Sequence, residues 1–455
     1  MPRPANGVRP GRRAVVGRPA VGLPSQKTAA RAKGQIVTAS PAPPPGSAAP
    51  SATAPEADED YPFPLGPLGE PPEAYADLRG HRPVSRVRMP SGDTAWYVTG
   101  YAEVEQALGD PLLSRAALRE PGAPRVITGP DFGDNPYNLL SQEGPDHLRI
   151  RRLISPAFTP RKAEGLRPRV RQIANELIDE LTANGSPADL HRDYAVQLPV
   201  RVIAEMLGAR ADELGRLQEW TDRLVSITAH TDAERLQARE ESAAYIAALV
   251  AERRADPGDD LLSALITARD DQDRLDEREL VWLGINILVA GHDTTVSAIS
   301  RGLFMLLRHP EQWKLLVDRP EILAHATEEL LRYAPPSEIG FMRVATEDTE
   351  VGGCPVAKGE GVIPVMHAAG RDHRELAEPD RLDLDRPREE AGKHLAFGFG
   401  PHYCPGAGVA RMELQVAFGE LARRLPGLEL AVPANDVEWI GGLLTLRPRE
   451  LPVVW

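Results

Sequence analysis

The chain has 455 residues, of which 42% are hydrophobic and 26% are charged, the composition of an ordinary globular protein. Its net charge is −13 at pH 7, although the segment Met1–Lys33 carries eight basic residues and no acidic one. The rest of the chain is therefore still more acidic, which argues against a nucleic-acid partner.

The first 60 residues differ in composition from the rest. Ser40–Pro55 consists almost entirely of Pro, Ala and Ser. Such a segment buries too little apolar surface to offset the chain entropy lost on folding. We therefore expect residues 1–60 to form a disordered, basic, Pro/Ala-rich extension, and residues 61–455 to form the folded domain. No apolar segment follows Arg12-Arg13, so an export signal is not supported.

The spacing of apolar residues predicts a mostly helical domain. Strand-like segments come first, at Val84–Met89 and Thr94–Val98. From Ala102 onward the apolar spacing is near the helical period of about 3.6 residues. The ranges with that spacing are Arg161–Ala183, Leu198–Leu207, Ala211–Val225, Thr231–Ala255 and Asp259–Thr267.

The longest periodic run is Leu275–Arg308, which contains no proline. As one helix it would be about 50 Å long, the width of a domain of this size. The later predicted helices are Glu311–Val317, Glu321–Tyr333 and Ala407–Arg424. The later predicted strands are Ile339–Val344, Thr349–Val351, Val362–Met366, Leu428–Val432, Leu443–Leu446 and Leu451–Val454. The sequence thus predicts a mainly α fold with a smaller β region, in a single large domain.

The number of cysteines and the lengths of the apolar runs indicate in which cellular compartment the protein is expected. Cys354 and Cys404 are too few for a disulfide framework or a cysteine-rich zinc site, and they fit a reducing cytoplasm. No stretch approaches 18 consecutive apolar residues, so no membrane-spanning helix is expected. Cys354 lies in a turn followed by a strand, where a structural role is expected. We expect a soluble, cytoplasmic monomer.

Cys404 lies in a glycine-rich loop that leads directly into a predicted helix. Residues 397–411 read F-G-F-G-P-H-Y-C-P-G-A-G-V-A-R. Gly398, Gly400 and Gly406 are expected to adopt positive φ and to let the backbone approach a flat object. The N–H groups at the start of the helix favour a thiolate over a thiol. A thiolate held in this way is an axial ligand for haem iron.

This loop resembles the haem-binding loop of the cytochrome P450 (haem-thiolate monooxygenase) family, F-G-x-G-x-H-x-C-x-G-x-x-x-A-R. Phe397, both spaced glycines, His402 and Gly406 are in register, which disfavours a plain packing cysteine. Val409 replaces the family's usual leucine and keeps an apolar contact. The resemblance is to soluble bacterial, actinomycete-like members, and it implies their fold over residues 61–455 and haem b as cofactor, with Cys404 as the iron ligand.

The resemblance also assigns an oxygen-activating segment, A-G-H-D-T-T at Ala290–Thr295 within the long helix. In the family this helix crosses the distal face of the haem. Asp293 and Thr294 match the acid–alcohol pair that relays protons to bound oxygen. Gly291, next to Ala290, is expected to leave space where oxygen binds.

Two further sets of residues match family motifs. Glu329 and Arg332 correspond to the buried E-x-x-R pair that braces the cysteine loop, with Arg381 as the expected third member and Arg386 as its rival. The haem propionates require cationic or hydrogen-bonding partners. The resemblance assigns that role to His147, Arg151, Arg343 and His402.

The substrate-binding regions implied by the resemblance are Arg119–Leu140, Val196–His230, Glu338–Phe341, Val289 and Gly441–Leu444. Their side chains, among them Phe132, Ile339 and Leu443, suggest an apolar pocket. The expected reaction is oxidation, above all hydroxylation, of an apolar small molecule, a natural-product intermediate. Oxidative C–C or C–O coupling or cyclisation of a peptide or aromatic product fits the sequence as well.

The sequence also bears on the source of electrons and on two alternative functions. The chain has no flavin or iron–sulfur segment, so electrons are expected from a ferredoxin and its reductase. Arg149, Arg152 and Arg411 are the expected basic docking patch. A peroxide-driven enzyme is disfavoured because the acid–alcohol pair is present. An inactive haem-binding partner subunit is disfavoured because Cys404 and the E-x-x-R pair are intact.

Overall fold

The computed structural model describes residues 59–128, 135–210, 213–270, 275–337 and 340–455. Its α-helices are α1 (Ala74–His81), α2 (Tyr101–Gly109), α3 (Gly144–Ile154), α4 (Pro160–Asn184), α5 (Gln197–Leu207), α6 (Leu214–Leu224), α7 (Asp232–Ala255), α8 (Leu261–Asp270), α9 (Glu277–Arg308), α10 (Pro310–Asp318), α11 (Leu323–Tyr333), α12 (Met366–Ala369), α13 (Arg388–Ala391) and α14 (Ala407–Arg424). Its strands are β1 (Glu59–Asp60), β2 (Val84–Arg88), β3 (Thr94–Val98), β4 (Leu113–Ser114), β5 (Ala188–Asp189), β6 (Arg343–Ala345), β7 (Thr349–Val351), β8 (Cys354–Val356), β9 (Gly361–Pro364), β10 (Glu429–Leu430), β11 (Trp439–Ile440), β12 (Arg447–Pro448) and β13 (Pro452–Val454).

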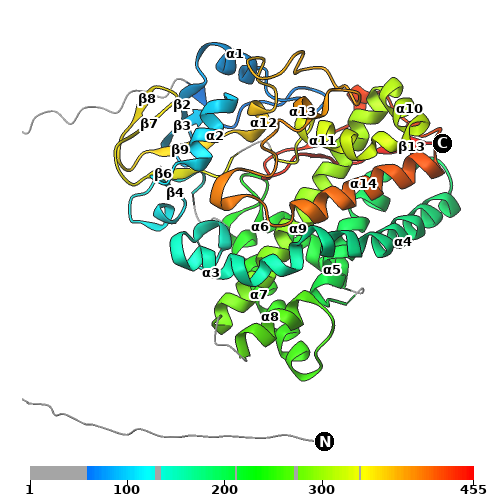
Figure 1. Ribbon diagram of the computed structural model, residues 1–455, viewed down its shortest axis with the longest axis horizontal. Coiled ribbons are helices and arrows are strands. Elements are labelled where there is room, and N and C mark those ends of the chain that lie inside the picture. The colour runs from blue at the N-terminus through cyan, green and yellow to red at the C-terminus, as the bar shows by residue number, and fades with distance from the viewer. Residues whose placement is uncertain (1–58, 129–134, 211–212, 271–274, 338–339) are drawn as a thin grey trace, which may run out of the picture. The chain divides into compact units, whose positions relative to one another are not determined.

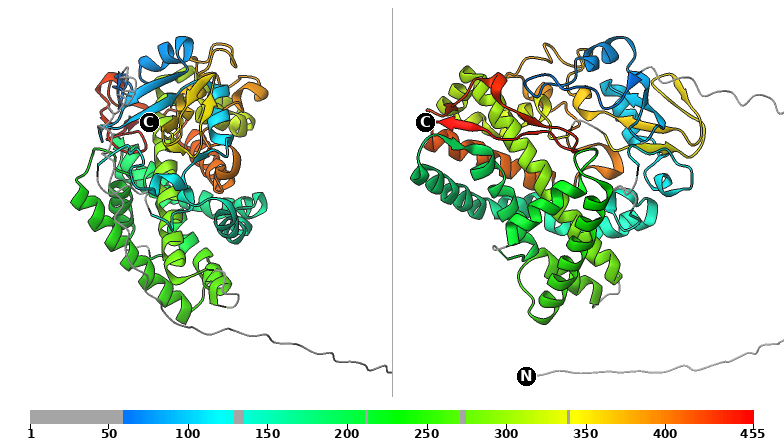
Figure 2. Two further views of the ribbon diagram at one scale, coloured as in Figure 1. Left: turned by 90° about the vertical axis from the view of Figure 1, so that its left-hand side faces the viewer. Right: turned by 180° about the vertical axis from the view of Figure 1, so that it is seen from behind.

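The long predicted helix forms as one continuous element, α9. Asp276 starts it with a capping box: its carboxylate accepts the N–H of Glu279 at 2.7 Å, and Glu279 accepts the N–H of Asp276 at 2.8 Å. Its 32 residues correspond to about 48 Å. Helices α5, α6, α7 and α14 pack against it (Figures 1 and 2). Almost every side chain of α9 beyond its first turn is buried, as expected for a central helix.

Helix α14, which begins just after Cys404, packs along α4 and against α11 (Figure 1). The contact faces are apolar: Leu177 and Leu181 of α4 and Phe418 and Leu421 of α14 belong to one buried cluster. The burial of such large side chains stabilises the fold by roughly 1.5–3 kcal/mol each. The start of α14 is therefore held by the packing of its whole length.

A sheet of six strands, counted over the described residues, has the order β1-β2-β3-β9-β6-β4. Strand β3 pairs with β9 in parallel, with Trp96 opposite Val362, and β9 pairs antiparallel with β6, with Val362 opposite Arg343. These pairings join segments far apart in the sequence. They place Arg343 in a buried strand next to β4, where it contributes to the candidate site.

Most predicted elements are confirmed, and some predictions at the ends of the domain are wrong. The bounds of β7 and α14 match the expected ranges. The domain starts earlier than residue 61, because Glu59–Asp60 forms β1 alongside β2; the remaining residues of the predicted extension lie outside the described part. The strand expected at Leu443–Leu446 is wrong: Leu443 makes only an isolated bridge to Ser226. The helix α1 had no sequence prediction.

None of the helices in the described ranges combines the length and the apolar character needed to cross a membrane.

Candidate active site

Cys404 lies between a short 3₁₀ turn at Gly400–His402 and the start of α14. Its N–H donates to the carbonyl of Phe397 at 2.9 Å, which closes the loop on itself. Gly398 and Gly400 adopt φ of 73° and 70°, as expected. The prediction for Gly406 is wrong, since its φ is −80°. A Cβ there would lie 3.8 Å from the sulfur of Cys404, so Gly406 serves the close approach of the backbone to the sulfur.

The electrostatic surroundings of Cys404 are mixed. Burial raises the pKa of the thiol, and the N–H groups of Gly406 and Ala407 and the charges of Arg151 and Arg411 oppose that rise. The helix N-terminus thus lowers the pKa of the thiol, as predicted, but burial raises this pKa by more. A metal cation on the sulfur would reverse this balance, because a coordinating thiol is deprotonated.

A group of cationic side chains surrounds His402, two residues before Cys404. The rings of His147 and His402 lie 4.5 Å apart. Burial and the nearby His147, Arg343 and Arg115 together lower the pKa of His402 to about 3. The Nε of Arg343 is buried and has no hydrogen-bond partner within the described residues. Such a cluster fits carboxylate groups like the haem propionates.

The structure adds a contact of Arg151 and a further arginine, Arg115, to what the sequence predicted for this cluster. Arg151 donates to the carbonyl of Tyr403 at 2.8 Å, so it links α3 to the cysteine loop as well as lying near His402. Arg115 had no sequence prediction. It is buried and donates to the carbonyls of Leu140 and Met342, at 3.2 and 2.8 Å. No local motif marks Arg115; only the pairing of β4 with β6 brings it to Arg343.

The segment Ala290–Thr295 interrupts the buried surface of α9. Ala290 is exposed, and Gly291 and Thr294 are partly exposed, although the residues on either side of this segment are mostly buried. The hydroxyl of Thr294 donates to the carbonyl of Ala290 at 2.7 Å. The prediction that Gly291 leaves space for oxygen is wrong, because a Cβ there would lie 2.7 Å from Cδ1 of Ile203. Gly291 allows α5 to pack closely against α9.

Asp293 is fully buried and points to the C-terminal part of the chain. Thr445 donates to one carboxylate oxygen at 2.7 Å, and Arg447 forms an ion pair with the other. Arg447 also pairs with Asp222 of α6, whose side chain is partly exposed. Burial raises the pKa of Asp293, and Arg447 and Thr445 oppose that rise. No sequence motif announced Thr445, Arg447 or Asp222, since they meet Asp293 only in the folded chain.

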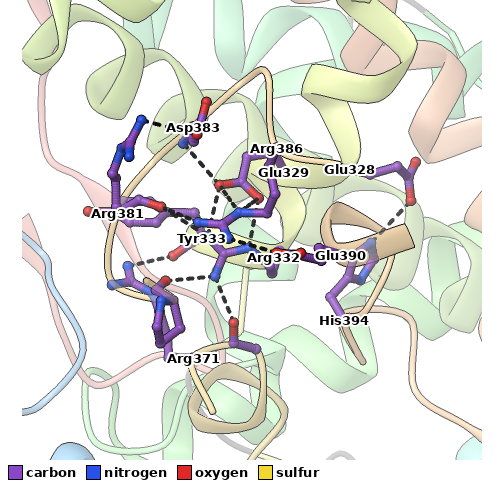
Figure 3. A network of polar contacts seen from close by, with 12 residues as sticks. Glu328, Glu329, Arg332, Tyr333, Arg371, Arg381, Asp383, Arg386, Glu390 and His394 are labelled. Carbon is purple, nitrogen blue, oxygen red and sulfur yellow. Dashed lines mark hydrogen bonds and ion pairs between the residues drawn. The ribbon is translucent and has the colours of Figure 1, made fainter. Parts of the chain in front are cut away.

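The E-x-x-R pair forms the centre of a buried polar network (Figure 3). Arg332 donates to Glu329 at 2.7 and 2.8 Å, and both side chains are fully buried. The third member is Arg386, whose Nε lies 3.1 Å from Glu329. The expectation for Arg381 is wrong: its side chain is 58% exposed, and it takes part only through its carbonyl, which accepts from Arg332 and Arg386.

We predict that Arg386→Ala destabilises the protein by about 3–5 kcal/mol, because Glu329 then loses a buried cationic partner. Arg381→Ala is the matched control and should change stability by less than about 0.5 kcal/mol, since an exposed side chain is removed. Urea unfolding of the two variants and the wild type measures both values. Equal effects of the two substitutions would contradict this assignment.

The substrate regions expected from the sequence come together in part. The carbonyl of Gly442 accepts the N–H groups of Ile227 and Thr228 at 2.8 and 2.9 Å, and Leu444 donates to Val225 at 2.9 Å. The segment after α6 is thus joined to the C-terminal turn. Val289 is buried in α9. Phe132, Glu338 and Ile339 lie outside the described residues.

The expected basic docking patch is mostly not available. Arg149 pairs with Glu279 at the start of α9, and Arg411 pairs with Glu328 of α11. Arg152 is exposed.

Comparison with known proteins agrees with this geometry. A sequence model of the cytochrome P450 family matches residues 89–318 and 312–426. The chain is 44% identical to the mycinamicin IV hydroxylase/epoxidase of Micromonospora griseorubida, over 84% of this chain and 94% of that protein. It is also 44% identical to the nocardicin C N-oxygenase of Nocardia uniformis subsp. tsuyamanensis, over 86% and 98%.

Among solved structures, the cytochrome P450 enzyme CxnD, for C–S bond formation in chuangxinmycin biosynthesis, superposes with a TM-score of 0.76 at 37% identity, over 84% of this chain and 93% of that chain. The family implies a haem-thiolate cofactor. With the family model covering most of the described residues and two relatives aligned over nearly their whole length, the chain belongs to the cytochrome P450 family.

Proposed function

We propose that this cytochrome P450 monooxygenase uses O₂ and two electrons from a ferredoxin and its reductase to oxidise an apolar natural-product intermediate, above all by hydroxylation. Its cofactor is haem b. The observation that carries the proposal is the position of Cys404: a partly buried sulfur in a closed loop just before α14, with arginine side chains beside it.

Different residues of the site would hold different parts of the haem. Cys404 would hold the haem iron through its sulfur. Phe397, Gly398 and Gly406 shape the loop that presents the sulfur. The propionates would be held by the guanidinium groups of Arg115, Arg151 and Arg343 and by the rings of His147 and His402, which can donate hydrogen bonds without a charge. Glu329, Arg332 and Arg386 hold the chain before the loop in place, since a buried ion-pair network fixes one geometry.

The haem, when bound, would supply oxygen activation, and the thiolate of Cys404 would donate electron density to it. Asp293 and Thr294 supply the protons. Thr294 presents its hydroxyl on the exposed face of α9, next to Ala290. Asp293 sits one residue before it and connects through Arg447 to Asp222, which is partly exposed. Arg447 stays protonated and holds the carboxyl of Asp293 in place, and Asp293 is the acid that we propose supplies the proton to Thr294.

The two relatives support a tailoring role. One is a mycinamicin IV hydroxylase/epoxidase and the other is a nocardicin C N-oxygenase. Both names describe the addition of oxygen to a natural product. A second candidate function, oxidative coupling, is supported by the likeness to CxnD, which acts in C–S bond formation.

The test begins with the difference spectrum of the dithionite-reduced protein with carbon monoxide. A band at about 450 nm is expected for a thiolate-ligated haem, and a band only at about 420 nm in folded protein would overturn the proposal. Turnover with ferredoxin, reductase and a panel of macrolide and peptide substrates then separates the two functions. Hydroxylation adds one oxygen atom to the product mass, whereas coupling removes hydrogen and adds none.

The ferredoxin docks, in this proposal, on the face formed by α3 and the cysteine loop. Arg152 is exposed there, and three of the exposed large apolar side chains belong to the same two segments: Leu148 of α3, and Phe399 and Tyr403 of the loop. Apolar contacts with a charged rim are typical of a transient protein interface.

We predict that Arg152→Glu raises the KM for ferredoxin roughly fivefold, equivalent to about 1 kcal/mol, and leaves reduction by dithionite unchanged. The reason is loss of charge complementarity with an acidic donor. The control is Arg449→Glu, an exposed arginine in the C-terminal part of the chain. Steady-state kinetics at varied ferredoxin concentration measures the effect, and an unchanged KM would remove Arg152 from the docking surface.

A further inference from the structure

A second polar cluster lies behind the cysteine loop and is separate from the E-x-x-R pair. Glu328 of α11 accepts from Arg411 of α14 at 2.7 and 2.8 Å. Nε2 of His394 lies 3.1 Å from the same carboxylate, and Figure 3 shows the two side chains pointing toward each other. Neither Glu328 nor His394 belongs to the haem-binding motif that the sequence presents.

Arg411 lies against the segment that carries the thiolate. Its guanidinium lies 4.4 Å from the centre of the Phe397 ring, and it donates to the hydroxyl of Tyr403 at 3.2 Å. Phe397 accepts the N–H of Cys404, and Tyr403 is the residue before it. The positive charge of Arg411 favours the thiolate form of Cys404. Arg411 is therefore placed to act electrostatically on the sulfur.

His394 also orients Glu328. Its Nδ1 accepts the N–H of Ala396 at 3.3 Å, so in the neutral ring the proton is on Nε2 and is donated to Glu328. The side chain of His394 is 3% exposed. Two donors thus hold the carboxylate of Glu328 in one position. Burial raises the pKa of Glu328, but the bonds from His394 and Arg411 outweigh burial and lower it to about 2, which keeps the group ionised.

We propose that Glu328 is a positioning residue for electron transfer: it holds Arg411 over Phe397 and neutralises that charge, and so lowers the reduction potential of the haem bound to Cys404. The inference rests on the proposed function. The step concerned is the transfer of one electron from the ferredoxin to ferric iron, which becomes ferrous. The positive charge of Arg411 alone would stabilise ferrous iron, which carries less positive charge than ferric iron. The negative charge of Glu328 cancels this effect and therefore favours the ferric state.

The test is the midpoint potential of the holoenzyme, measured by spectroelectrochemistry. Glu328→Gln keeps the size of the side chain and removes its charge. The expected result is about a tenfold shift toward ferrous iron at a given ambient potential, which is 59 mV for one electron. Glu328→Asp keeps the charge and should restore most of the wild-type potential.

Glu420→Gln is the matched control. Glu420 also lies on α14 and pairs with Arg171 and Arg423, but it is nine residues beyond Arg411, about 13 Å along the helix. Its replacement removes a comparable ion pair and should leave the potential unchanged.

Arg411→Gln gives an independent measurement if Glu328→Gln binds haem poorly. Loss of the cation should shift the potential in the opposite direction, and the double variant Glu328→Gln/Arg411→Gln should return close to the wild-type value. A purely structural role for Glu328 would lower thermal stability with no change in potential, and that result would overturn the inference. Absence of the 450 nm band in the wild type would instead overturn the proposed function itself.

Discussion

Replacing Cys404 with alanine is expected to abolish the carbon monoxide band at about 450 nm and to reduce turnover below detection. The sulfur is the atom of this loop that the family motif assigns to the iron, whereas the ring of His402 lies 4.5 Å from that of His147, in the proposed propionate site. The substitution removes the ligand and leaves the loop closed. The difference spectrum of the purified variant, loaded with haem, is the measurement.

The matched control for this variant is Cys354→Ala. Cys354 begins β8, pairs with Val351 of β7 and is likewise partly buried. Its replacement should leave the band, the turnover and the haem content unchanged. If Cys404→Ala kept the 450 nm band, or if Cys354→Ala lost it, the assignment of the axial ligand would have to be abandoned.

The features that the sequence predicted well are local. The loop around Cys404 closes through a bond between residues only seven apart, and the pair Glu329–Arg332 spans one helical turn. The start of α9 is likewise determined by Asp276 and Glu279, three residues apart. Interactions of this kind depend on short-range backbone geometry, which a motif records directly.

The features that the sequence missed depend on tertiary contacts. Arg381 and Arg386 lie on the same irregular segment, and only the folded backbone turns the side chain of Arg386 inward and that of Arg381 outward. The same holds for Arg447, which comes to Asp293 from more than 150 positions away. The role of Gly291 was misinterpreted because no residue near it in the sequence indicates that Ile203 packs against it.

Charged surfaces were the least predictable part, for a related reason. Arg149 and Arg411 read as a basic patch when the sequence is considered alone, yet each is neutralised by a carboxylate from a distant helix, Glu279 or Glu328. A cation that is paired contributes little to a long-range field. Arg411, which was expected in the docking patch, instead pairs with Glu328 and lies near the sulfur of Cys404.

Asp293→Asn is expected to lower the rate of product formation by about 100-fold, at the low end of the range for loss of a general acid. The amide preserves the geometry: its oxygen still accepts from Arg447, and its nitrogen can donate to the hydroxyl of Thr445. The fold and haem binding should therefore survive, and the lost activity reports the lost proton. The ratio of product formed to NADPH consumed should fall, with the difference appearing as hydrogen peroxide.

The pH dependence separates a proton-donating role of Asp293 from a structural one. Burial raises the pKa of Asp293, so its carboxyl keeps a proton to higher pH than an exposed aspartate does. The wild-type rate should thus fall as pH rises and the carboxyl ionises, whereas the rate of Asp293→Asn should show no such fall. Thr445→Val is the control, because it removes one hydrogen bond and leaves the acid in place. Wild-type coupling in Asp293→Asn, or an equal loss in Thr445→Val, would mean that Asp293 acts through packing alone.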